Sequence, residues 1–217
     1  DQYSYTSLSS AEYIAQCEQQ LPEGVELIRA AAEDIEATGS GGLFSAAGKS
    51  YRASQLYDSR PPAMAENGLK QHFVGWEIRT KSPISDPQIA TLMDFRVDQS
   101  RGLHFIYVLP FSDRQLLIES TMISTQLEDK DWYRQAMVAW LESQDIEIEQ
   151  TLREEAGVIP MDTITPVDSQ IACIGAASGA VRLSSGYAFS GIQAQIAKLA
   201  QGISAGDYSV PPPISPG

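Results

Sequence analysis

Four strand-like runs between positions 71 and 123, separated only by short turns, constrain the fold more than any other feature of the sequence. The runs are Gln71–Thr80, Thr91–Val97, Leu103–Phe111 and Gln115–Ile123. Their spacing leaves no room for the crossover helices that parallel neighbours need. This part of the chain therefore predicts an antiparallel sheet.

A helix and a further strand follow these four runs. The helix is predicted over Asp129–Glu142, and Ile146–Leu152 alternates apolar and polar residues as a half-buried strand does. The residues expected on or near one apolar face of the helix are Trp132, Ala136, Val138 or Ala139, and Leu141.

The segment before the sheet is a helix followed by short strands. Ser9 and Ser10 are good N-caps for a helix over Ala11–Gln20, which Leu21–Gly24 ends. The strands predicted after it are Val25–Ile28, Ala31–Ala37, Gly42–Ala46 and Ser50–Asp58.

The segment after residue 170 is a strand, a loop and a helix. Ile171–Ile174 is a short apolar strand, Gly175–Ser185 is the loop, and the helix runs from Gly186 to about Gln201. The proline-rich end of the chain, from residue 206, is expected to be a frayed tail.

Charge and residue usage exclude several classes of function. The 217 residues include 28 acidic and 15 basic side chains, a net charge of -13, so no basic track for nucleic acid is expected. Cys17 and Cys173 lack CxxC spacing and favour two buried reduced thiols over a disulfide. His72 and His104 have no partner at ligand spacing, so no metal site is predicted. No apolar run approaches the ~20 residues of a membrane-spanning helix.

The glycine-rich stretch Gly175–Gly179, followed by Ser184-Ser185-Gly186-Tyr187, has two interpretations. Small residues between a strand and a helix let backbone N–H groups and the helix dipole approach an anionic or electron-rich ligand. The same residues are also typical of a tight strand-to-helix corner, where small side chains allow close packing. Taken alone, the stretch favours the corner.

A carboxylate interrupts the apolar run Leu116–Thr121 at Glu119. If the side chain faces a pocket, desolvation raises its pKa and makes it a candidate general acid. If it faces water, it is an ordinary strand glutamate, which is the commoner case. The nearby stretch Glu154–Met161 is either a strand end with its turn or a loop lining a ligand, and its spacing does not decide between them.

Read in order, these segments resemble the lycopene cyclase family of flavoproteins over most of residues 3–201. Each motif is weak alone, whereas their order and spacing are specific. The motifs are Leu56–Arg60, Gly75-Trp76-Glu77, Met93–Arg96, Phe105–Pro110, Leu117–Thr121, Glu155–Met161, and Gly175 with Ser185-Gly186-Tyr187.

The resemblance implies a mixed α/β chain that is part of an FAD/NAD(P)-binding dinucleotide fold with an inserted antiparallel substrate-binding sheet. Residues 1–66 and 153–205 would belong to the FAD-binding domain, residues 67–152 would form the substrate sheet and its helix, and residues 206–217 would be the tail. The first βαβ unit with its G-x-G-x-x-G and a C-terminal extension have no counterpart here, so an internal fragment of a longer protein is expected. Gly39–Gly42 is no substitute, because it lies between two strand-like runs.

The resemblance also assigns roles to single residues. Glu119 matches the family's proton donor, and Ser120 stands where many relatives carry a second acid, which puts a two-acid mechanism in doubt. The residues implied to bind the cofactor are Asp58, Arg60, Gly175, Gly179, Ser185, Gly186 and Tyr187. Those expected to line the substrate are Trp76, Asp94, Phe105, Tyr107 and Met161, although at least half of the aromatic ones are as readily explained as sheet core.

The activity implied is that of an intramolecular lyase or isomerase, lycopene β-cyclase, in carotenoid biosynthesis. Glu119 would protonate the end of linear lycopene, reduced FAD would stabilise the resulting cation, and NAD(P)H would keep the flavin reduced. Because lycopene is a lipid-soluble polyene, a peripheral contact with the cytoplasmic side of a membrane is expected.

Two other functions are open to the sequence. An FAD-dependent monooxygenase or related oxidoreductase acting on a hydrophobic substrate would consume NAD(P)H and oxygen and would not need Glu119. A non-catalytic carrier of hydrophobic ligands would need neither flavin nor Glu119, but it would leave the glycine-rich loop unexplained.

Overall fold

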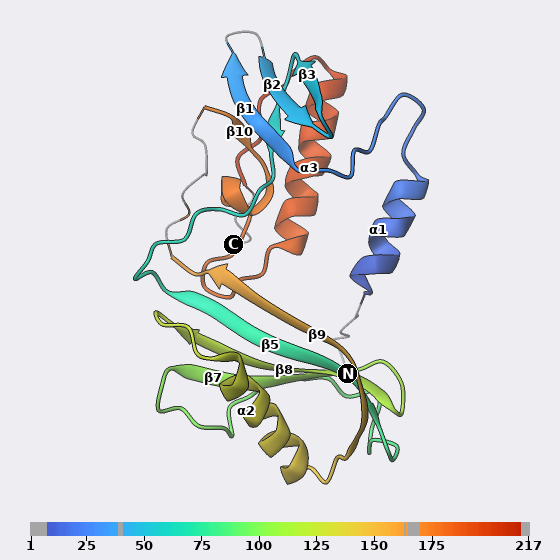
Figure 1. Ribbon diagram of the computed structural model, residues 1–217, viewed down its shortest axis with the longest axis vertical. Coiled ribbons are helices and arrows are strands. Elements are labelled where there is room, and N and C mark those ends of the chain that lie inside the picture. Colours follow the sequence, from blue (N-terminus) through green and yellow to red (C-terminus); the bar gives the residue numbers. More distant parts are fainter. Residues whose placement is uncertain (1–7, 39–40, 163, 165–169, 214–217) are drawn as a thin grey trace. The chain divides into compact units, whose positions relative to one another are not determined.

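The computed structural model describes residues 8–38, 41–162, 164 and 170–213 (Figure 1). The chain divides into two compact units. Unit 1 comprises Asp1–Gln20 and Asn67–Ile159, and unit 2 comprises Leu21–Glu66 and Pro160–Gly217. Strands and helices occur in both units, which confirms the mixed α/β class.

Unit 1 is built on a five-stranded sheet in the order β6-β7-β8-β5-β9. The pairs β6–β7, β7–β8 and β5–β8 are antiparallel, which confirms the prediction for the four central runs. The strands are β5 (Lys70–Thr80), β6 (Thr91–Asp94), β7 (Leu103–Pro110), β8 (Gln115–Ser124) and β9 (Ile148–Pro160). β9 is longer than the predicted strand over Ile146–Leu152 and takes in the Glu154–Pro160 segment, so that segment is strand rather than loop.

Helix α2 (Lys130–Ser143) packs on one face of this sheet (Figure 1). The side chain of Asp129 caps its first turn by accepting a hydrogen bond from the N–H of Asp131 at 2.8 Å. Of the predicted apolar face, Leu141 is buried and Trp132 packs partly buried against the core, whereas Val138 and Ala139 are exposed. The helix buries Tyr133, Met137, Trp140 and Leu141, a stripe rotated by one residue, or about 100°, from the expected one.

Strand alternation gives the sheet two unlike faces. Val74, Ile106, Ile118 and Met122 point toward α2 and form the apolar core with it. The opposite face carries Glu119, which lies directly across from Gly75 on β5 and Tyr107 on β7. One face of the sheet therefore forms the apolar core with α2, and the other face does not contact α2.

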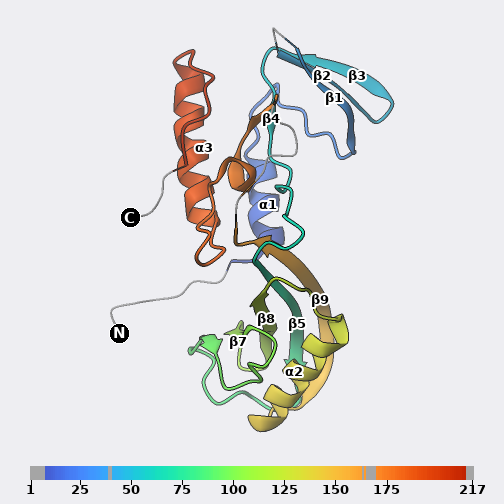
Figure 2. The same ribbon diagram turned by 90° about the vertical axis from the view of Figure 1, so that its left-hand side faces the viewer.

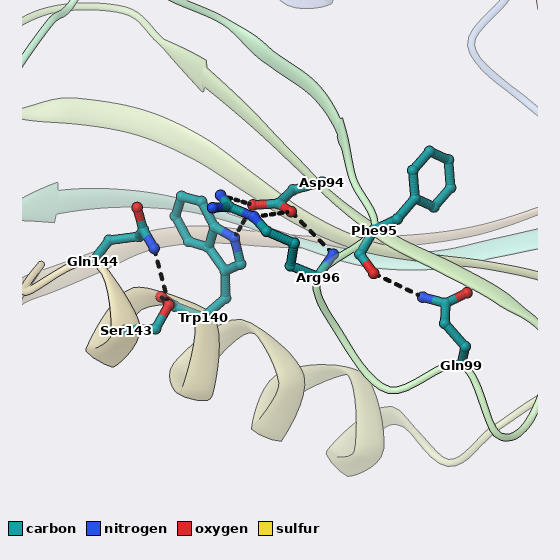
Figure 3. A network of polar contacts seen from close by, with 7 residues as sticks. All are labelled: Asp94, Phe95, Arg96, Gln99, Trp140, Ser143 and Gln144. Carbon is teal, nitrogen blue, oxygen red and sulfur yellow. Dashed lines mark hydrogen bonds and ion pairs between the residues drawn. The ribbon is translucent and has the colours of Figure 1, made fainter.

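Strand β6 ends at Asp94, three residues before the predicted end, because the Asp94 carboxylate binds the next turn (Figure 3). It accepts hydrogen bonds from the backbone N–H of Arg96 at 3.0 Å and from the Arg96 guanidinium at 2.9 and 2.7 Å. The indole N–H of Trp140 on α2 donates to the same carboxylate at 2.9 Å. These bonds hold the pKa of Asp94 far below its usual range, with Arg96 as the largest cause.

Unit 2 contains a three-stranded antiparallel sheet and a parallel strand pair. The sheet consists of β1 (Ala32–Thr38), β2 (Gly41–Ala46) and β3 (Lys49–Ala53). The pair consists of β4 (Tyr57–Asp58) and β10 (Ala172–Cys173). The predicted strand Ser50–Asp58 is thus two strands in different sheets, split by a bend at residues 54–55. Residues 39–40 of the glycine-rich turn Gly39–Gly42 lie outside the described residues.

Two other predictions before residue 30 were wrong. Val25–Ile28 forms no strand, since no neighbouring strand pairs with it and Val25 and Leu27 are both 52% exposed. Helix α1 (Ser10–Gln19) forms as predicted, with Ser9 as its N-cap, but Cys17 on it is exposed rather than buried. Cys17 and Cys173 are both free thiols.

The chain ends in helix α3 (Phe189–Ser204), which lies beside the short 3-10 helix η1 (Gly175–Ser178) that follows β10 (Figure 2). Helix α3 begins three residues later than predicted, because Gly186 adopts a left-handed conformation with φ +73°. The described part of the tail is tied down: the carbonyl of Pro211 accepts a bond from Gln195, and that of Tyr208 accepts one from Tyr57. Across the described residues, no helix is long and apolar enough to cross a membrane.

Replacing Asp94 with Asn tests how much the Asp94 network stabilises unit 1. The variant keeps an acceptor for Trp140 but loses the charge that pairs with Arg96, so the free energy of unfolding should fall by about 1–3 kcal/mol at pH 7. The loss should shrink as the pH falls below about 4, because the carboxyl group of the unfolded chain then takes up a proton that the folded protein, with its lowered pKa, resists. Urea titrations followed by circular dichroism measure both effects. Glu142→Gln, on the exposed side of α2, is the control and should leave the midpoint unchanged.

Candidate functional site

The first candidate site is the sheet face of unit 1 that α2 leaves free, with Glu119 at its centre. Strand β8 places Glu119 between Gly75 on β5 and Tyr107 on β7. The hydroxyl of Thr121, buried two residues along β8, donates to the Glu119 carboxylate at 2.5 Å. No basic side chain is recorded in a bond with Glu119 within the described ranges. The carboxyl group is therefore held by a neutral donor.

Burial raises the pKa of Glu119 to about 7. The Thr121 hydrogen bond lowers the pKa in part, and the negative charge of Glu155 raises it further. A carboxylic acid with a pKa near neutrality can hold a proton and release it at physiological pH, as a general acid must. Glu119 is half-buried, and its raised pKa favours the pocket-facing interpretation over the solvated one.

Ser120 points to the other side of the sheet, as the alternation of a strand requires. Its hydroxyl is fully buried and lies 2.9 Å from Nε2 of His104, whose Nδ1 lies 3.1 Å from the carbonyl of Asp98. Burial lowers the pKa of this histidine. A side chain at position 120 therefore faces the α2 layer, and a second acid there would not lie beside Glu119.

Two of the residues predicted to line the substrate share the face of Glu119. Phe105 and Tyr107 alternate with buried Ile106 on β7, and their rings meet edge to face at 5.1 Å between centroids. Phe105 also contacts Phe95 at 5.5 Å. Together with Phe73, which stands opposite Thr121 on β5, they make this face rich in aromatic rings.

Trp76 and Asp94 lie on the opposite face, so the structure does not bring them together with Glu119. Trp76 pairs with Ile118, packs against the α2 core and donates its indole N–H to Glu154 at 2.8 Å. Asp94 pairs with Ile106 and is bound by Arg96 and Trp140. Their expected place beside the substrate conflicts with strand alternation, because each belongs to the side that α2 covers.

Glu155, the first residue of the Glu155–Met161 motif, is a site residue to which the sequence analysis assigned no role. It lies on β9, which flanks β5, and its Cγ is 3.5 Å from the position that a Cβ on Gly75 would take. Cβ and Cγ of Glu119 lie 3.5 Å from the same point. The two glutamates therefore flank Gly75 on one face. The signal available in the sequence was the alternation in residues 146–152, the start of a strand that continues to Pro160.

The second candidate site is the loop of unit 2 between β10 and α3. Gly175, Gly179 and Gly186 all have positive φ, which lets the chain turn tightly before the helix. The fully buried side chain of Gln195 on α3 holds the start of the loop: its Oε1 accepts the N–H of Gly175 at 3.0 Å, and its Nε2 donates to Ser178 at 2.8 Å.

After the residues that Gln195 binds, the loop borders an open cavity of about 620 Å³. The hydroxyl of Ser185 is buried and has no hydrogen-bond partner within the described residues. Tyr187 and Phe189 are 57% and 59% exposed, and the N-cap residue Ala188 offers no side-chain cap. An unpaired hydroxyl, uncapped helix N–H groups and exposed rings suit a ligand with aromatic and polar parts.

Two predicted cofactor residues, Asp58 and Arg60, form a pair at the end of β4. The guanidinium of Arg60 donates to the Asp58 carboxylate at 2.6 to 3.0 Å, and the Arg60 N–H adds a bond at 2.8 Å. Arg60 thereby lowers the pKa of Asp58. Met161, predicted to line the substrate, is 8% exposed and belongs to unit 2. In the parts of the chain that are described, no group of three or more His, Cys, Asp or Glu could hold a metal ion.

Comparison with known proteins gives a match along nearly the whole chain. A family model described as lycopene cyclase protein matches residues 1–210. The lycopene β-cyclase of Pantoea ananas is 34% identical over 125 residues, which is 54% of this chain and 32% of that protein. The lycopene β-cyclase of Pseudescherichia vulneris is 28% identical over 161 residues, 72% of this chain and 40% of that protein. The matched region thus spans about a third to two fifths of these relatives.

Solved structures share the fold at low sequence identity. A geranylgeranyl bacteriochlorophyll reductase-like protein from Thermoplasma acidophilum superposes with a TM-score of 0.59 at 13% identity, covering 83% of this chain and 50% of that one. An anhydrotetracycline hydroxylase from Streptomyces rimosus gives 0.52 at 13% identity, with 84% and 40% covered. These likenesses concern the fold alone.

The raised pKa of Glu119 predicts a pH-dependent gain of stability in Glu119→Gln. Below pH 4.5 the carboxyl group is protonated in both folded and unfolded chains, whereas above pH 7 the folded protein must hold a desolvated charge. The amide avoids this cost. The variant should therefore exceed wild type in free energy of unfolding by roughly 2 kcal/mol more at pH 8.5 than at pH 5. Urea titrations at the two pH values measure the difference, and an equal effect at both would contradict the assignment. Glu149→Gln, at an exposed position of β9, should show no such pH dependence.

Proposed function

The chain belongs to the lycopene cyclase protein family, and from that membership we propose that it carries the acid of an enzyme that cyclises linear lycopene. The reaction converts the open ends of the polyene to β-ionone rings with no net redox change. The observation that carries the proposal is Glu119: a desolvated carboxyl group with a pKa of about 7, on a sheet face with aromatic rings.

Glu119 acts as the proton donor. Its O–H bond breaks as a C–H bond forms at the terminal alkene, which leaves a tertiary carbocation on the neighbouring carbon. The next double bond attacks this cation and closes the six-membered ring. Loss of a proton from the ring restores a double bond, so that protons and electrons balance and no oxidant is consumed.

The aromatic residues beside Glu119 stabilise the carbocation. Tyr107 stands directly across from Glu119, and Phe105 contacts Tyr107 edge to face. The faces of such rings attract positive charge, and more strongly where water is excluded. Phe105 is 1% exposed and supports Tyr107 from within, so the half-buried ring of Tyr107 provides the apolar surface for a polyene, which has no polar group to bind.

Flavin is the proposed cofactor, held by the loop of unit 2. The residues fit it in that Ser185 has an unpaired buried hydroxyl, Gly179 and Gly186 keep side chains away from the loop, and α3 presents its N-terminus. When bound and reduced, FAD would supply negative charge that stabilises the carbocation. NAD(P)H is the proposed reductant. We also propose that the protein works in peripheral contact with the cytoplasmic side of a membrane, where its apolar substrate dissolves.

The role of Glu119 is tested in bacteria that accumulate lycopene. Wild type should convert lycopene to cyclic carotene, whereas Glu119→Gln should leave it linear, with conversion reduced at least 100-fold, because the amide cannot donate the proton. Extracts are compared by chromatography, and flavin absorbance of the purified proteins serves as the folding control. If both strains keep linear lycopene while the protein is soluble and flavin-loaded, the cyclase proposal fails. Oxygen consumption with NAD(P)H then tests a monooxygenase.

The proposed flavin site is tested by Ser185→Ala. Loss of one hydrogen bond from a buried hydroxyl should weaken FAD binding about five- to tenfold with no loss of thermal stability. Titration of the apoprotein, followed by quenching of flavin fluorescence, measures the affinity. Ser204→Ala, at the far end of α3, is the matched control, since the Ser204 hydroxyl donates to the carbonyl of Ala200 within its own helix. Equal affinities for the two variants would remove Ser185 from the site.

A further inference from the structure

Two carboxylates from different strands approach the same point above Gly75. Glu119 on β8 and Glu155 on β9 each place side-chain carbons 3.5 Å from where a Cβ on Gly75 would lie. That distance is an ordinary contact, so glycine at this position leaves a gap between the two glutamates that any larger residue would begin to fill. The gap lies over β5, between β8 and the edge strand β9.

The charges around this gap are unevenly distributed. Nη1 of Arg153 binds Glu155 at 2.7 Å, and Nε of the same guanidinium lies 3.5 Å from Glu77, which also accepts a bond from Gln115 at 2.6 Å. Glu119, in contrast, is bonded by the Thr121 hydroxyl. Arg153 therefore pairs with Glu155 and lies near Glu77, whereas the hydrogen bond that Thr121 donates to Glu119 comes from a neutral group.

The groups that face Glu119 can be named for each neighbouring element. Strand β5 contributes Glu77, β7 contributes the phenol of Tyr107, β9 contributes Glu155 with Arg153, and α2 lies on the other side of the sheet. Glu154, the acid next to Glu155 in sequence, takes no part, because it is bound by Arg134 and Trp76. Among these groups, Glu155 is the carboxylate whose charge acts on Glu119.

We propose that Glu155 is a positioning residue for the proton donor, whose negative charge across the Gly75 gap keeps Glu119 protonated until the alkene is bound. The inference rests on the proposed role of Glu119. It adds a second carboxylate from a distant strand, in place of an acid adjacent in sequence.

The charge of Glu155 favours both the return of a proton to Glu119 and the carbocation that forms before it. When Glu119 gives up its proton, two carboxylates face each other across the gap, and their repulsion favours return of a proton to Glu119. The proton lost from the ring can therefore reload the same residue, and the reaction needs no outside acid or base. The fixed negative charge also lies near the carbocation that forms in between.

Glu155→Gln tests the inference through a titration that does not depend on turnover. The carbonyl stretch of protonated Glu119, identified as the infrared band lost in Glu119→Gln, reports its protonation directly. In Glu155→Gln the midpoint of this titration should move down by about one pH unit, as expected for removal of a nearby like charge. The alkaline limb of the cyclisation pH profile should move with it, which lowers activity about tenfold above pH 7. Glu155→Asp, which keeps the charge, should restore most of the wild-type behaviour.

A second variant should shift the midpoint of the Glu119 titration in the opposite direction. Arg153→Gln removes the cation that offsets Glu155, so the midpoint should move to higher pH; the side chain is 54% exposed and its loss should not prevent folding. Glu149→Gln, exposed on the same strand, should leave the midpoint unchanged. If neither Glu155→Gln nor Arg153→Gln moves the midpoint, the inference is overturned. If the midpoint moves but wild type does not cyclise lycopene, the charge coupling stands and the proposed function fails.

Discussion

The packing of α2 against one face of the unit 1 sheet is the interaction on which the rest of that unit depends. Met137, Trp140 and Leu141 bury the apolar side of β5, β7 and β8, and this burial fixes which residues of each strand point inward. Because successive side chains alternate, the same contact fixes which residues point away. Glu119, Gly75 and Tyr107 share the free face because Ile118, Val74 and Ile106 are needed for the core.

Much of this arrangement could be predicted from the sequence, and the failures have physical causes. The four central strands and α2 follow from apolar periodicity and turn residues, which are local signals. The buried face of α2 does not, since Trp132 and Ala136 form one apolar stripe, Tyr133 and Met137 form another, and only the shape of the sheet selects between them. Val25–Ile28 has the alternation of a strand but no partner to complete its hydrogen bonds.

The site was predictable only in part, because it depends on register between strands. Alternation within β8 alone separates Glu119 from Ser120. Whether Trp76 or Gly75 lies opposite Glu119 depends on the register between β5 and β8. A shift of one residue exchanges the two, and the sequence of neither strand alone determines the register. Prediction of Glu155 as a neighbour of Glu119 would also require the knowledge that β9 pairs with β5, although more than sixty residues separate these two strands. The buried Ser185 hydroxyl falls in a loop that was identified by its glycines, whereas its lack of a partner is visible only in three dimensions.

Three acids of this chain, Asp58, Asp94 and Glu119, differ in what binds them from two residues later. Asp58 and Asp94 are followed at that distance by Arg60 and Arg96, whose guanidinium and backbone N–H groups both reach the carboxylate, and the pKa of each aspartate falls. Glu119 is followed by Thr121, which offers a hydroxyl and no charge, and desolvation then raises its pKa. A carboxylate paired with arginine is stable as an anion and suits structure, as the Asp94 contact to Trp140 illustrates. A buried carboxyl group without a cation is stable only while it holds its proton, and that instability of the anion is what proton donation followed by recapture requires.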